Sequence, residues 1–269
     1  MRPPTVGTIE SWCFELVSTH SLAHKVEPPE VGNAAWEADP PVRRLARPGR
    51  PAQLAVTGRS ARTPSAKTLS GRAQLVHTFL HHELQAAELF AWAILAFPDT
   101  PRAFRAGLLG LCREELAHLG LYRRHLEQLG FAVGAFGVRD WFWERVAGCE
   151  NAAAFVALMG LGLEGANLEH CARFAAEFRA AGDEDGAAVL ERVGREEVGH
   201  VAFAVRWFER LSGAPLDYER WRASLPAPLT PSVLMGASLN REARLRAGQG
   251  EAFLARLAAE PPSNVRRRS

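Results

Sequence analysis

The sequence has 269 residues, 47% of them hydrophobic, and a formal net charge of +2. This length suits one large domain or a domain with terminal additions, and the composition can bury a sizeable core. A charge so close to zero gives no electrostatic attraction to nucleic acid or to an anionic membrane, so we expect neither as a partner. The four cysteines are scattered and form no Cys-x-x-Cys pair, which is typical of reduced thiols in a cytoplasmic protein.

Neither a signal peptide nor a membrane span is expected from the apolar segments. Residues 9–25 are interrupted by two glutamates and two histidines. The most apolar windows, 90–97 and 152–163, are shorter than the roughly 20 residues that a membrane helix needs. We therefore expect a cytoplasmic protein without membrane contact.

The first 66 residues differ in composition from the rest. They hold nine of the 17 prolines, and residues 40–62 are rich in proline and arginine with little periodicity. We interpret residues 1–66 as a short amphipathic helix followed by an extended arm that wraps the main body. A partly disordered tail is the alternative for the Pro/Arg-rich part.

Residues 67–213 predict two helical hairpins. Apolar residues at spacings of 3 and 4 predict a helix from about residue 70 to 97, and Thr100 and Pro101 supply the N-cap and first position of a second helix, which Gly130 closes. A connection over 131–149 carries the aromatic cluster Trp141-Phe142-Trp143.

The second predicted hairpin consists of a helix over about 150–181 and another that begins after Asp183 and ends near residue 211. Two tight hairpins joined by one long crossover is the connectivity of a ferritin-like four-helix bundle, so the predicted fold class is all-α. Residues 214–269 form an accessory segment with a Pro-rich stretch, helical turns around 240–257 and a basic tail, Arg266-Arg267-Arg268.

The motifs that carry chemistry are two Arg-Glu-Glu-x-x-His runs, at 113–118 and 195–200. A Glu and a His three residues apart lie on one helix face and can bind one ion together. Each run follows a solitary Glu of the preceding helix, at 32 residues in the first hairpin and 33 in the second. The predicted metal ligands are Glu83, Glu115, His118, Glu164, Glu197 and His200.

This donor set predicts two iron ions, with Mn/Fe and Mn/Mn as alternatives. Carboxylates and one imidazole per metal suit Fe(II) and Mn(II), and no thiolate is present to select zinc. Four carboxylates cancel the charge of two divalent cations, whereas without metal their burial as anions would be costly.

Spacing alone leaves a rival pair of ligands open. Glu88 and Glu169 precede the second Glu of each motif by 27 and 28 residues. The apolar neighbours of Glu83 and the apolar run before Glu164 favour these two, and Arg173, four residues after Glu169, is typical of a solvated helix face. Cys112 and Cys171 are expected to face inward as small apolar side chains.

At these motifs the chain resembles the ferritin-like superfamily of di-iron carboxylate proteins. More closely, it resembles a bacterial domain-of-unknown-function family allied to the tRNA-modifying di-iron hydroxylase MiaE. The matching segments are Gly49-Arg50-Pro51, Glu83-Leu84-Gln85-Ala86, Glu115-Leu116-Ala117-His118, Leu163-Glu164-Gly165-Ala166, Glu197-Val198-Gly199-His200-Val201 and Asn240-Arg241-Glu242-Ala243-Arg244. The first 45 residues match weakly, and Glu114 departs from the family pattern. The resemblance implies the bundle fold and supports Glu83 and Glu164 as ligands.

We expect the protein to activate O2 for hydroxylation or oxidation of a small organic substrate, with an external electron donor. The alternative functions are metal or peroxide handling, as a ferroxidase, a peroxidase or a manganese catalase-like enzyme, and a non-catalytic helical bundle. A homodimer is compatible with the sequence. The residues identify neither the substrate nor the reductase.

Overall fold

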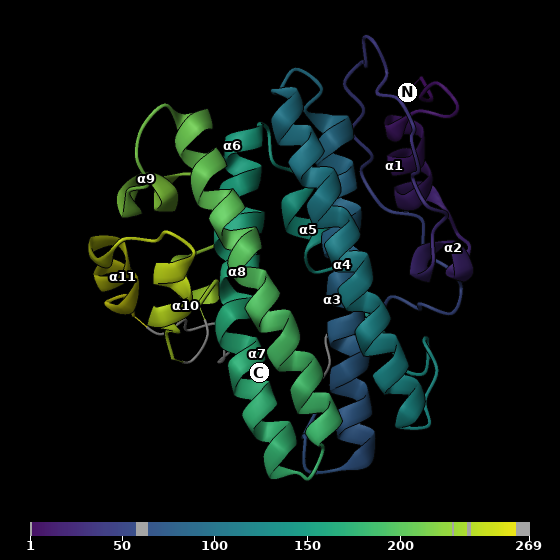
Figure 1. Ribbon diagram of the computed structural model, residues 1–269, viewed down its shortest axis with the longest axis vertical. Coiled ribbons are helices and arrows are strands. Elements are labelled where there is room, and N and C mark those ends of the chain that lie inside the picture. Colours follow the sequence, from purple (N-terminus) through teal and green to yellow (C-terminus); the bar gives the residue numbers. More distant parts are fainter. Residues whose placement is uncertain (1, 58–63, 228, 236–237, 262–269) are drawn as a thin grey trace. The chain divides into compact units, whose positions relative to one another are not determined.

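A computed structural model describes residues 2–57, 64–227, 229–235 and 238–261, and these form helices without a β-strand (Figure 1). The predicted all-α class is confirmed for this part of the chain. The chain divides into two compact units, Met1–Gly148 and Cys149–Ser269. The boundaries expected at residues 66 and 213 stay predictions.

The first unit is built on a hairpin of two long helices, α3 (Leu69–Ala96) and α4 (Arg102–Gln128), which lie side by side (Figure 1). The Thr68 hydroxyl accepts a hydrogen bond from the backbone N–H of Gly71 at 3.1 Å and so caps α3. The predicted cap of α4 was one residue early. Pro101 is the N-cap, and the Thr100 hydroxyl instead donates to the carbonyl of Phe97 at 2.7 Å.

The N-terminal residues pack on α3. Two short helices, α1 (Ile9–Ser18) and α2 (Leu22–Val26), precede an extended stretch. In this stretch the backbone N–H of Arg43 donates to the carbonyl of Leu95 at 2.9 Å, and the Trp92 indole donates to the carbonyl of Leu45 at 3.0 Å. Up to residue 57 the chain therefore has short helices and an extended stretch in contact with α3, and the wrapping arm as a separate part of the chain stays a prediction. The end of the Pro/Arg-rich stretch lies outside the described residues.

The connection after α4 also packs on α3. Its short helix α5 (Trp143–Val146) buries Trp143 against Trp92, with ring centroids 6.5 Å apart. Phe142 stacks on His82 at 4.8 Å. This aromatic cluster therefore belongs to the packing of the first unit.

In the second unit the expected third helix is divided by a π-helix, which the sequence did not predict. The segments are α6 (Ala152–Phe155), the π-helix η1 (Val156–Glu164) and α7 (Gly165–Ala180). The apolar run in η1 is buried on all sides, so it has no amphipathic period from which hydrogen-bond spacing could be read. π-Helical segments are rare and often lie at functional sites.

Helix α8 (Glu184–Ser212) pairs with α7 as a second hairpin (Figure 1). The Asp183 carboxylate accepts from the backbone N–H of Gly186 at 2.9 Å, which confirms the predicted N-cap. Gly213 ends the helix in the left-handed region, at φ +71°.

The C-terminal segment adds α9 (Tyr218–Ala223), a 3₁₀ turn η2 (Pro231–Val233), α10 (Arg241–Arg246) and α11 (Glu251–Ala258). The last two confirm the helical turns expected around 240–257, whereas α9 was not predicted. The basic tail lies outside the described residues. No described helix combines the length and apolar character that crossing a membrane requires.

Candidate metal centre

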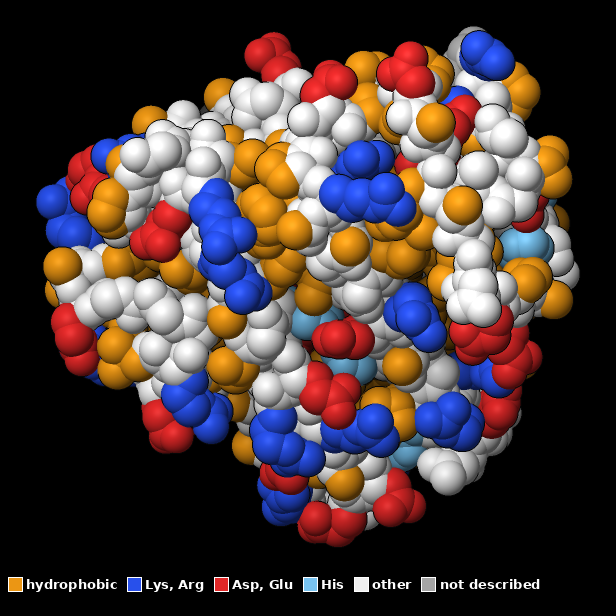
Figure 2. Space-filling model, turned by 45° about the horizontal axis from the view of Figure 1, so that its top comes forward, with side chains coloured by type: hydrophobic (Ala, Val, Ile, Leu, Met, Phe, Trp, Pro, Cys, Tyr) orange, Lys and Arg blue, Asp and Glu red, His pale blue; other side chains and the backbone are white. Residues whose placement is uncertain are grey.

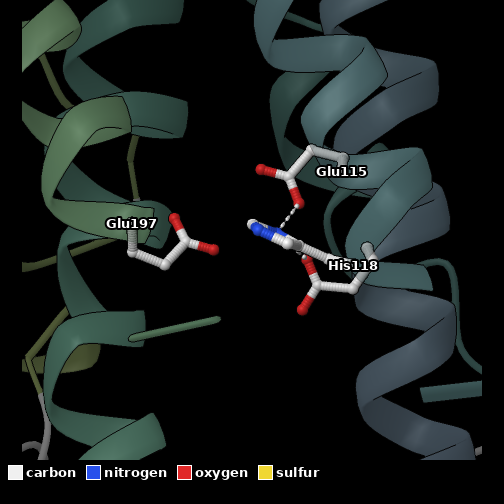
Figure 3. Close-up of side chains that lie close together, drawn as sticks. Glu115, His118 and Glu197 are labelled. Atoms are coloured by element: carbon white, nitrogen blue, oxygen red, sulfur yellow. Dashed lines mark hydrogen bonds and ion pairs between the residues drawn. The ribbon is translucent and has the colours of Figure 1, made fainter. Parts of the chain in front are cut away.

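The first unit brings together Glu83 from α3 and Glu115 and His118 from α4. All three are buried, and one ligand atom from each lies within 4.8 Å of the others. The His118 Nδ1 atom is 3.3 Å from Glu115 Oε2, the ion pair drawn as a dashed line in Figure 3, and 3.8 Å from Glu83 Oε2. We call this group the first triad.

Burial and proximity perturb the acid–base behaviour of the first triad. Burial and the neighbouring Glu115 carboxylate raise the pKa of Glu83 well above its usual value. Burial alone would lower the pKa of His118, but hydrogen bonds and charges from Glu115 and Glu83 raise that pKa to about 12. The two carboxylates thus favour a positive charge at this place.

The second unit forms an equivalent second triad from Glu164, Glu197 and His200. Glu164 is the last residue of the π-helix, and the other two lie on α8, from which Figure 3 shows Glu197 projecting. All three are buried and offer ligand atoms within 4.8 Å of one another. The His200 Nδ1 atom is 3.2 Å from Glu197 Oε2, the same atom pair as in the first triad.

The distances within each triad fit a metal ion. In octahedral coordination with metal–ligand bonds of about 2.1 Å, neighbouring ligand atoms are about 3 Å apart. The histidine–carboxylate separations of 3.2 and 3.3 Å are close to this value. Both triads are therefore groups of buried carboxylate and imidazole side chains that could hold a metal ion.

The rival Glu88 has other partners. Its carboxylate accepts from Arg50 at 2.6 and 2.9 Å, from Lys25 at 2.5 Å and from the Trp143 indole at 2.8 Å. Burial would raise the pKa of Glu88, but the Arg50 and Lys25 charges outweigh it and lower the pKa. Glu88 therefore anchors the N-terminal arm and α5 to α3.

Glu169 has a corresponding place in the second unit. Arg244 donates to both of its carboxylate oxygens at 2.7 Å, and the backbone N–H of Asn240 donates to it at 2.9 Å. Glu169 is buried, so the solvated position that its spacing from Arg173 indicated was wrong. Like Glu88, it joins an accessory segment to a hairpin.

Sequence reasoning missed Asn167, which contacts the second triad. Its side-chain amide donates to Glu197 Oε1 at 3.0 Å and accepts from the Cys171 thiol at 3.6 Å. The available signal was its position three residues after Glu164, on the same face of the helix.

Comparison with known proteins gives a family and one distant relative. No solved structure matches the chain. An uncharacterized protein of Haemophilus influenzae is 27% identical over 190 residues, which cover 67% of this chain and 66% of the relative's own length. The profile of the family described as "Protein of unknown function (DUF455)" matches residues 13–255. Because this match covers most of the sequence, the chain belongs to the DUF455 family.

Proposed function

We propose that the two triads together bind two metal ions in the core of a ferritin-like four-helix bundle. One observation supports this most strongly. Two hairpins that follow one another in the chain each carry a buried Glu/Glu/His group with nearly the same residue spacing and the same Nδ1–Oε2 pairing. If the Glu and His residues had been placed by chance, the two hairpins would have no reason to bury the same pair of atoms.

The proposed metal is iron, with Mn/Fe or Mn/Mn as the alternatives. Oxygen and imidazole donors favour Fe(II) and Mn(II) over metals that prefer thiolates. The pKa values support a cation at this place, because the first triad stabilises a positive charge on His118. A metal ion would replace the imidazolium proton and leave a neutral imidazole as ligand.

The proposed reaction is hydroxylation or oxidation of a small organic substrate by O2. A bound pair of ferrous ions would supply the electrons that begin the reduction of O2. Insertion of one oxygen atom into a C–H bond consumes O2, two electrons and two protons and releases water, so an external electron donor is part of the proposal. The chain's own residues would fix the ligand atoms and exclude water by burial.

The resemblance to the tRNA hydroxylase supports the class of reaction and not the substrate. On the face drawn in Figure 2, basic and acidic side chains are interspersed among the described residues. A polynucleotide is bound by clustered positive charge. We therefore propose a small molecule in place of tRNA.

Anaerobic loading with Fe(II) tests the proposal. The purified protein is expected to bind two iron ions per chain, measured by elemental analysis, and then to consume O2 with a change in visible absorbance. Fewer than about one iron per chain would overturn the dinuclear site. Rapid peroxide disproportionation by the manganese-loaded protein would favour peroxide handling over hydroxylation.

Matched variants assign the ligands. Glu115→Ala and Glu197→Ala are expected to abolish two-metal loading. Glu114→Ala and Glu196→Ala are the controls, because these neighbours are exposed on the same helices. Equal loss of metal in control and test variants would contradict the assignment.

A further inference from the structure

The two triads differ in what surrounds their second glutamate. In the second unit a line of side chains leads to Glu197. The Cys171 thiol donates to Asn167 Oδ1 at 3.6 Å, and the Asn167 amide nitrogen donates to Glu197 Oε1 at 3.0 Å. Because the amide oxygen of Asn167 accepts from the Cys171 thiol, the amide nitrogen is the end that faces the Glu197 carboxylate.

Gly194 makes room for this line of contacts. A Cβ atom on Gly194 would lie 2.8 Å from Cys171 Cβ, closer than side chains approach one another. Without a side chain at this place on α8, Cys171 on α7 packs directly beside it. The hydrogen bonds therefore depend on three residues of the second unit: Asn167, Cys171 and Gly194.

Residues of another chemistry occupy the equivalent positions in the first unit. Counting from Glu83 as from Glu164, Asn167 corresponds to Ala86 and Cys171 to Phe90. Counting back from Glu115 as from Glu197, Gly194 corresponds to Cys112. The methyl group of Ala86 has no hydrogen to donate to a carboxylate. The second unit thus has an amide donor at position 167, whereas the equivalent position of the first unit, 86, has none.

The amide restricts how Glu197 binds a metal. Its hydrogen bond uses a lone pair of Oε1, while Oε2 lies 3.2 Å from His200 Nδ1. Oε2 is therefore the Glu197 oxygen that faces His200 and that would bind a metal shared with it. Hydrogen bonds to metal-binding carboxylates orient the ligand, and their loss typically costs about 10- to 100-fold in metal affinity.

We propose that Asn167 is a positioning residue that makes the two metal subsites unequal. It would hold the Glu197 carboxylate in one orientation, with Oε2 toward His200, so that the subsite of the second triad differs from that of the first in metal affinity. This inference rests on the proposed dinuclear site.

Titration with Co(II), followed by calorimetry and visible absorbance, tests the inference. The wild-type protein is expected to bind two ions with two separate constants. Asn167→Ala should weaken one constant about 10- to 100-fold and change the other less than about threefold. Cys171→Ser, which keeps a hydrogen-bond donor, should retain the wild-type constants. Thermal unfolding of the metal-free variants checks that each remains folded.

Two backgrounds identify the affected subsite. With Glu115→Ala only the second subsite remains, and adding Asn167→Ala should weaken it. With Glu197→Ala only the first remains, and adding Asn167→Ala should change nothing. The infrared difference spectrum between the Co(II) and metal-free forms is expected to show carboxylate bands in Asn167→Ala that are shifted from those of the wild type. If a double variant binds no metal, this comparison of Asn167→Ala with the wild type decides the question instead.

The outcomes separate this inference from the proposed function. If the wild-type protein binds no Co(II), the dinuclear site is wrong. If it binds two ions but Asn167→Ala leaves both constants and the carboxylate bands unchanged, the site stands and the role of Asn167 is wrong. Equal weakening of both subsites would also overturn that role.

Discussion

Arg244 holds Glu169 through two hydrogen bonds of 2.7 Å, from Nε to Oε1 and from Nη2 to Oε2. Arg50 binds Glu88 in the same two-pronged way in the other unit, at 2.6 and 2.9 Å. Both glutamates lie five residues after the first glutamate of a triad. Each half of the chain thus uses one buried glutamate in its triad and another to anchor an accessory segment.

Glu169→Ala is expected to destabilise the protein without loss of metal. Removing one partner of a buried ion pair leaves the other charge unpaired and costs about 3–5 kcal/mol. Urea unfolding measures this loss, and elemental analysis should still find two metals per chain. Glu177→Ala is the control, because its pair with Arg173 is half exposed and 3.8 Å long, worth at most about 1 kcal/mol. Loss of metal with unchanged stability would make Glu169 a ligand.

Arg50→Met is expected to loosen the N-terminal arm. The substitution keeps side-chain bulk but removes the two-pronged contact with Glu88, through which the arm is joined to α3. Amide hydrogen exchange, followed by mass spectrometry, should accelerate at Arg43 and Gly49, whose N–H groups donate to Leu95 and Val17. Arg47→Met changes an exposed arginine of the same arm and should leave the exchange slow. Equal exchange in the two variants would contradict the anchoring role.

Glu83→Gln is expected to separate metal binding from folding. Burial and the Glu115 charge disfavour an ionised Glu83, so a neutral amide of the same shape should leave the metal-free protein at least as stable. The added stability from metal, about 2.7 kcal/mol at 100 times the dissociation constant, should disappear. Thermal unfolding with and without Mn(II) measures both effects. Glu88→Gln should instead destabilise the metal-free protein, because Lys25 and Arg50 lose the buried Glu88 charge that both contact. Similar losses in both variants would refute this contrast.

Gly160→Ala is expected to disturb the π-helix that carries Glu164. A Cβ atom at Gly160 would lie 2.4 Å from the Cβ of Ala204, so the backbone of η1 or α8 must move. Overpacking of this kind costs about 1–3 kcal/mol. Gly110→Ala is the control, since open space surrounds that helical position and alanine there should stabilise by up to about 1 kcal/mol. Denaturant unfolding and Co(II) affinity should both fall in Gly160→Ala only.

The sequence predicted what depends on neighbours along the chain. Helical periodicity and the end signals at Asp183 and Gly213 were sufficient for the two hairpins. The π-helix was not predictable, because it is contacted by residues that lie far from it in the sequence. These are the methyl group of Ala204 and the Trp221 indole, which donates to the carbonyl of Ala157 at 2.9 Å.

The same limit applies to the candidate site. A Glu and a His three residues apart could be recognised as a chelating pair from spacing alone. The rivals Glu88 and Glu169 could not be separated in that way, because their partners Arg50 and Arg244 are 38 and 75 residues away in the chain. Asn167 was missed for a similar reason, since its contact with Glu197 spans 30 residues. The ligand set itself stays a prediction.

The buried His77 is expected to make stability depend on pH. Its Nε2 atom accepts a hydrogen bond of 2.9 Å from the backbone N–H of Gly134, which only the neutral ring can do. Burial and the nearby His81 lower the pKa of His77 to about 4, against 6.5 in the unfolded chain. Between these values the unfolded state binds more protons, so stability is complete above pH 6.5 and falls as the pH drops towards 4, by up to about 3 kcal/mol.

His77→Gln isolates this contribution. The glutamine carbonyl can still accept from Gly134 but does not titrate, so the free energy of unfolding should vary less between pH 6.5 and 4 than in the wild type. The other ionisable groups are common to both proteins and cancel in the difference. Urea unfolding at half-unit pH steps, with metal removed by a chelator, measures the two profiles. Parallel profiles would show that His77 does not titrate with a lowered pKa in the folded state.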